Sequence, residues 1–169
     1  MDALSLLARL MRHNERANRL VFEACLEMGA ETLDAPAPGT SGTLGGTLRH
    51  LVGVEDIYLA MLQQVPPETA GGSLQEYMAH DLQWFTHRAG EIAAGYRELL
   101  GGIDAIWLDG PLHVPWFDFP LTRADGLLQV AMHSEQHRAQ ILSVRGARGL
   151  PDVHVDYVDM VGEMVKRGG

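Results

Sequence analysis

Two histidines in the last third of the chain are spaced so that they could bind one metal ion. His133 and His137 stand four residues apart in the segment 122–145, TRADGLLQVAMHSEQHRAQILSVR. In an α-helix, two such positions lie about 40° apart around the axis and one turn apart along it. Because neutral imidazole is a common ligand of transition metals, the pair predicts a chelating site. Core packing of two histidines is the alternative.

Two further polar side chains of this segment bear on the chemistry. Glu135 falls about 160–200° from both histidines on a helix, so it cannot be the general base of a His-Glu-x-x-His zinc protease. Gln140 lies within about 40° of His133 and could orient a ligand or a bound water. An exposed amide with no such role is the alternative.

The candidate third ligand lies in another helix. His50 stands at the edge of the apolar face of a helix expected over 43–64. A helix expected over 4–28 carries Asn14 and Asn18 on its apolar face. Amides on a core face either belong to a buried hydrogen-bond network or face a polar cavity. A solvent-exposed edge position is the third alternative for both.

The elements that must position these residues are amphipathic helices. Apolar residues at helical spacing predict four of them and a short fifth, over 4–28, 43–64, 73–99, 122–145 and 155–167. Ser73 and Glu76 have the spacing of a capping box at the third helix, and Thr122 and Asp125 resemble one at the fourth. Gly46, together with the glycine before it, leaves the start of the second helix unsettled, because glycine is a poor helix former.

The segment 104–121 differs from the rest of the chain. It contains three prolines, two tryptophans and two phenylalanines, which favour an extended excursion or irregular hairpin over a helix. We expect it to lie across one end of the helices. Trp116 or Phe117 could then shape the mouth of a pocket, or the segment could serve packing alone.

Composition limits the class of protein. The 169 residues suit one domain with a real core, spanning 1–169, and the contents of 46% hydrophobic and 21% charged residues are ordinary for a globular protein. A net charge of −9 argues against nucleic acid or an anionic membrane as partner. The single cysteine, Cys25, cannot form an internal disulfide and is expected to be a core thiol. Without a basic and apolar leader or a membrane span, we expect a cytoplasmic protein.

Three segments together resemble the DinB/YfiT-like four-helix bundle proteins, over nearly the whole chain. They are RHNERANRLVFEAC, GTLRHLVGVEDIYL and LLQVAMHSEQHRAQILSVRGARGLP. The resemblance implies an all-α, antiparallel four-helix bundle. It also implies a divalent metal bound by one histidine of the second helix and a His-x-x-x-His pair of the fourth. Those residues are here His50, His133 and His137.

The function implied by the resemblance is metal-dependent chemistry on a small molecule. Three imidazoles leave open positions on the metal, and zinc or nickel is the expected ion. Relatives of this fold include thiol S-transferases and a thiol-dependent isomerase, so a low-molecular-weight thiol is an expected co-substrate. Asn14, Asn18 and Gln140 would line the pocket. The alternatives are a metal-dependent hydrolase and a non-catalytic metal-binding protein of a stress response or a structural dimer; in each case we expect a homodimer.

Overall fold

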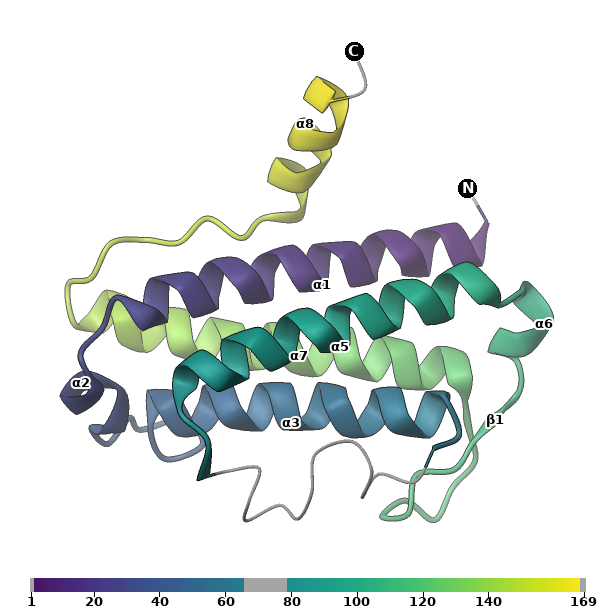
Figure 1. The fold of residues 1–169 in the computed structure, drawn as a ribbon, viewed down its shortest axis with the longest axis horizontal. Coiled ribbons are helices and arrows are strands. Elements are labelled where there is room, and N and C mark those ends of the chain that lie inside the picture. Colours follow the sequence, from purple (N-terminus) through teal and green to yellow (C-terminus); the bar gives the residue numbers. More distant parts are fainter. Residues whose placement is uncertain (1, 66–78, 168–169) are drawn as a thin grey trace.

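The computed structural model describes residues 2–65 and 79–167, which are almost entirely helical (Figure 1). The main helices are α1 (Ala3–Leu26), α3 (Leu44–Leu62), α5 (Leu82–Gly102) and α7 (Arg123–Ala147). The shorter elements are α2 (Ala30–Asp34), α6 (Ala105–Leu108), β1 (Pro111–Leu112), β2 (Leu121–Thr122) and α8 (Tyr157–Arg167). The predicted four-helix bundle is confirmed, as are the excursion before the fourth helix and the short C-terminal helix.

The four long helices form a square in which α1 and α3 each pack against both α5 and α7. Contacts between side chains give the directions: α1 runs antiparallel to α5, and α3 runs antiparallel to α7 (Figure 1). By contrast α3 and α5 run in the same direction, with Asp56 contacting Arg88 and Leu59 contacting Gly95. The bundle therefore mixes antiparallel and parallel neighbours.

Helix starts follow the capping chemistry of the sequence. Thr43 caps α3 by accepting a hydrogen bond from the Gly46 amide at 2.9 Å. A Cβ on Gly46 would lie 2.9 Å from the Ser41 carbonyl oxygen, so the glycine lets the preceding loop fold back onto the helix. Asp81 caps α5 by accepting from the Trp84 amide. The capping box expected at Ser73 and Glu76 lies outside the described residues.

The aromatic excursion forms α6 and a two-stranded antiparallel hairpin in which Pro111 pairs with Thr122. A Cβ on Gly126 would collide with Leu112, so the start of α7 packs closely on β1. The excursion thus lies at the end of the bundle where α3 ends and α7 begins (Figure 1).

Side chains from all four long helices form the core. Cys25 of α1 is completely buried, as are Phe22, Leu48, Phe85 and Leu127. Helix α8 stands off from the bundle (Figure 1). It contacts α1 through Tyr157, which packs against His13, and through an ion pair of 2.7 Å between Arg16 and Glu163. None of the helices in the described residues is long and apolar enough to cross a bilayer.

Candidate metal centre

The antiparallel packing of α3 and α7 brings three histidines together. One ring nitrogen from each of His50, His133 and His137 lies within 4.8 Å of the others. The Nε2 atoms of His133 and His137 are 3.1 Å apart. Two nitrogens bound to one tetrahedral zinc at about 2.05 Å would be about 3.3 Å apart, so this pair fits one ion with little rearrangement.

Each histidine is placed by its helix. The capping box of Thr122 and Asp125 that starts α7 is confirmed in both directions. It fixes the register of the helix, so His133 and His137 lie on successive turns with ring centroids 4.3 Å apart. Exposure increases across the cluster, since His137 is buried, His133 is half-buried and His50 is exposed. The site is therefore open to solvent on the His50 side.

The local environment favours neutral imidazoles, which is the form that binds metals. Burial, together with the neighbouring His137 and His50, lowers the pKa of His133 to about 4. Burial, and then the neighbouring His137, also lowers the pKa of His50. His133 Nδ1 is buried and has no hydrogen-bond partner among the described residues. A neutral ring that binds a cation through Nε2 suits this environment.

Gln140 fixes the orientation of one of the three rings. Its Oε1 lies 2.7 Å from Nδ1 of His137. Because an amide oxygen can only accept a hydrogen bond, Nδ1 of His137 must carry a proton, which leaves Nε2 as the atom that can bind a metal. Of the three predicted pocket-lining residues, Gln140 is the one that touches the histidine cluster.

Asn14 and Asn18 lie in a buried polar network instead. Their amide groups donate to Glu55 Oε1 at 2.6 and 2.8 Å, and their carbonyl oxygens each accept from Arg138 at 2.6 Å. Ser134 donates to the same Glu55 oxygen at 2.6 Å. Both asparagines also line a cavity between α1 and α5. Their amides thus join a carboxylate of α3 to a guanidinium of α7.

Sequence reasoning missed Glu55, Ser134 and Arg138. Arg138 is only 2% exposed and follows directly after a metal-binding candidate, where an arginine would usually be read as a surface residue. The available signal was the pair of asparagines on the apolar face of α1, since buried amides need polar partners from other helices. That signal indicated a network without naming its members.

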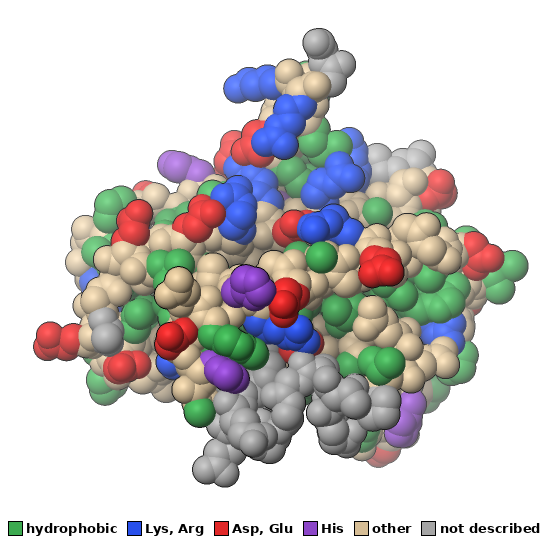
Figure 2. Space-filling view, in the orientation of Figure 1, with side chains coloured by type: hydrophobic (Ala, Val, Ile, Leu, Met, Phe, Trp, Pro, Cys, Tyr) green, Lys and Arg blue, Asp and Glu red, His purple; other side chains and the backbone are tan. Residues whose placement is uncertain are grey.

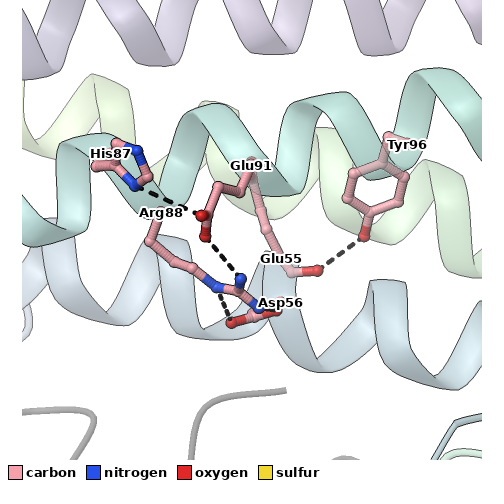
Figure 3. Close-up of polar contacts among 6 residues, drawn as sticks. All are labelled: Glu55, Asp56, His87, Arg88, Glu91 and Tyr96. Atoms are coloured by element: carbon pink, nitrogen blue, oxygen red, sulfur yellow. Dashed lines mark hydrogen bonds and ion pairs between the residues drawn. The ribbon is translucent and has the colours of Figure 1, made fainter. Parts of the chain in front are cut away.

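A second polar contact holds α3 against α5 (Figure 3). Arg88 donates to both carboxylate oxygens of Asp56, at 2.8 and 2.9 Å, and to Glu91 at 2.8 Å. These bonds raise the pKa of Arg88, despite the opposing effect of burial. The Tyr96 hydroxyl donates to the backbone oxygen of Glu55 at 2.9 Å. Helix α3, which carries His50, is therefore held against α5 by these hydrogen bonds and the ion pair.

The aromatic excursion reaches α3 further along its length. Trp116 is exposed and lies 6.3 Å from the ring of Tyr58, measured between ring centroids. Tyr58 follows His50 by eight residues, or about 12 Å along the helix axis. Phe117 stacks on Phe119 and makes an edge contact with Trp116. The aromatic excursion therefore contacts α3 at Tyr58, about 12 Å along the helix axis from His50.

Comparisons with known proteins agree with this architecture. A family model described as the DinB superfamily matches residues 13–141. Among solved structures, the chain is similar to YfiT from Bacillus subtilis, with 17% sequence identity and a TM-score of 0.69, over 89% of this chain and 92% of that one. YfiT is described as a probable metal-dependent hydrolase with an unusual four-helix bundle topology. The comparison with curated proteins gives no match. From the family match over most of its length, the chain belongs to the DinB superfamily.

Proposed function

We propose that this protein is a metal-dependent hydrolase whose divalent ion is bound by His50, His133 and His137. The observation that carries the proposal is the convergence of three imidazole nitrogens within 4.8 Å on an accessible side of the bundle. A divalent ion held there would supply Lewis-acid polarisation and a nucleophile at neutral pH. Three protein ligands leave room for a substrate.

The side chains around the cluster prepare it for this role. Gln140 holds His137 in the tautomer that presents Nε2, and burial keeps His133 neutral at pH 7. His50, the exposed member, lies on the side from which a small molecule would enter. Hydrolysis is our first choice because YfiT, which has the same fold, is described as a probable metal-dependent hydrolase.

Thiol transfer is the second candidate. Within the described residues, no aspartate or glutamate belongs to the group of side chains that could hold the metal. Glu135, the acidic residue between the two histidines of α7, pairs with Arg138 at 2.7 Å. A thiol needs no protein base when a cation depresses its pKa, so a site with no carboxylate among its candidate ligands suits a low-molecular-weight thiol as co-substrate.

The metal itself is the first thing to test. We expect about one zinc or nickel ion per chain when untagged protein, purified without chelator, is measured by mass spectrometry. His50→Ala and His137→Ala should each lose the ion while keeping the helical circular-dichroism signal. The matched control is His87→Ala, because His87 is an exposed histidine of α5 outside the cluster.

Activity assays then separate the candidates. Loaded protein is offered ester and amide substrates without a thiol, and thiol–electrophile pairs in parallel. Turnover of esters or amides that disappears in His133→Ala supports the hydrolase. Turnover that requires a thiol would instead support the thiol transferase. A protein that binds metal and turns over neither set would favour a non-catalytic metal-binding role. Wild type that takes up no metal after reconstitution would refute the proposal.

A further inference from the structure

Basic side chains are concentrated at one place on this acidic protein. Five of its 13 lysines and arginines line a single cavity of about 580 Å³ between α1, α5 and α8. They are Arg12, Arg16, Arg19, Arg97 and Arg167. Figure 2 shows basic side chains gathered where α8 meets the bundle. With Glu15 and Glu163 as the acidic side chains of its lining, the cavity carries a net charge of 5 − 2 = +3 in a chain of net charge −9.

Three of these five guanidinium groups have unused hydrogen-bonding capacity, whereas Arg19 and Arg97 form ion pairs with Glu23 and Glu15. Arg16 donates to Glu163 through Nε and Nη2, but its Nη1 is buried and has no partner among the described residues. Arg12 has Met164 Sδ at 4.0 Å as its contact. In the described part of the chain, neither Arg12 nor Arg167 lies within ion-pair distance of a carboxylate. Donors gathered in this way suit an anion with several acceptor oxygens.

An apolar groove continues from this basic cavity. It lies between α1 and α5, has a volume of about 550 Å³, and shares Arg12, Arg19 and Arg97 with the basic cavity. Its walls include Met11, Phe22 and Leu100. Its acidic side chains are Glu15 and Glu23, which pair with Arg97 and Arg19, and Glu55, which accepts from the buried asparagines. The volume falls within the range of about 300–1,000 Å³ typical of small-molecule pockets. One elongated ligand could therefore occupy both parts.

We propose that this groove binds a small amphipathic anion, with a carboxylate or phosphate head group on a short hydrocarbon chain. The head group lies between Arg12 and Arg167, and the chain follows the apolar wall between α1 and α5. The charge of the cavity selects the head, and the adjoining apolar wall selects the tail. This site lies between α1, α5 and α8 and touches α3 at Glu55, but none of the three histidines lines it, so the inference does not rest on the proposed hydrolase.

Isothermal titration calorimetry with octanoate and octyl phosphate tests this inference. Both should bind, whereas acetate, inorganic phosphate and octanol should each bind at least about tenfold more weakly, because each has only the head or only the tail. Binding should weaken between 50 and 500 mM NaCl as the head-group attraction is screened. Equal heats from octanol and octanoate would contradict a charge-selecting site.

A pair of double variants provides the matched comparison. Arg12→Gln/Arg167→Gln should weaken octanoate binding by roughly ten- to a hundredfold. Arg9→Gln/Lys166→Gln removes the same charge from the same two helices outside the cavity lining and should leave the affinity within about twofold. His133→Ala should also bind octanoate normally. The inference fails if wild type binds no octanoate, if both double variants lose equal affinity, or if His133→Ala abolishes binding.

Discussion

The orientation of a metal-binding imidazole depends here on a side chain outside the three-histidine cluster. Gln140 fixes the tautomer of His137 through a single contact of 2.7 Å. Gln140→Leu should therefore lower the affinity for zinc by about ten- to a hundredfold, as loss of such a supporting contact typically does. Gln140→Glu, which keeps an acceptor oxygen, should retain the affinity. Competition with a chromophoric chelator measures both values.

The control for this variant is Gln129→Leu, because Gln129 is an exposed amide of the same helix. If both leucine variants lost affinity equally, a general effect on α7 would explain the result. Unchanged affinity in Gln140→Leu would show that His137 keeps its orientation by other means.

The burial of His13 should make the stability of the protein depend on pH. It packs edge-on against Tyr157 at 5.6 Å between ring centroids, and its Nδ1 is buried without a partner among the described residues. Burial, then the charge of Arg138, lowers its pKa; the nearby charges that also act on it are Glu135, Arg16 and Asp156. The folded chain thus favours neutral His13, whereas the unfolded chain binds a proton near pH 6.5. Stability from this residue is present above that pH and is lost as the pH falls from there through the lower pKa of the folded state.

Urea unfolding at pH 7.5 and 5.5 checks this expectation. Wild type should lose more free energy of unfolding between the two values than His13→Phe, which keeps an aromatic ring against Tyr157 but cannot titrate. The other histidines with lowered pKa are present in both proteins, so the difference between the two losses belongs to His13. Equal losses would contradict the prediction.

At the scale of the helix, replacing either of two helical glycines by alanine should change the stability of the protein in opposite directions. Gly46→Ala should destabilise the protein by about 1–3 kcal/mol, because the new Cβ meets the Ser41 backbone oxygen, which cannot rotate away. Gly90→Ala in α5 meets no atom within 4 Å and should stabilise by about 0.5–1 kcal/mol through helix propensity. Thermal unfolding of the two variants decides the matter. If both variants were more stable than wild type, the loop before α3 would have shifted to make room for the new Cβ at position 46.

The helices themselves were readable from the sequence, because each must bury one apolar face. The predicted ranges 4–28, 43–64 and 122–145 differ from α1, α3 and α7 by no more than two residues at each end. The parallel packing of α3 and α5 could not be predicted from the sequence. Periodicity identifies the face that a helix buries, but it does not indicate the direction in which the neighbouring helix runs.

The histidine triad was predictable for a related reason. His133 and His137 are brought together by one helix, so local spacing reveals them, whereas His50 entered through the family resemblance. The network of Glu55 and Arg138 joins residues 37–124 positions apart in the chain. Such contacts depend on the three-dimensional packing of α1, α3 and α7, which local patterns do not determine.

This network should dominate the stability of the whole molecule. Arg138 is 2% exposed and Glu55 is 3% exposed, and two asparagines lie between them. Arg138→Ala would leave the buried carboxylate and both amide oxygens without their cation, which typically costs about 3–5 kcal/mol. Guanidinium-chloride unfolding measures this loss. Arg148→Ala, which removes an exposed arginine bound to the Thr32 carbonyl, should cost less than about 1 kcal/mol.

Cys25 gives the molecule a built-in reporter of its own opening. The thiol is completely inaccessible in the core, and burial raises its pKa to about 11 against the opposing effect of Arg145. A disulfide reagent such as DTNB can therefore reach it only when α1 separates from the bundle. Since the sequence contains no other cysteine, the labelling rate at low reagent concentration measures the equilibrium population of opened molecules under native conditions. Every substitution considered above can be ranked by this rate without adding denaturant.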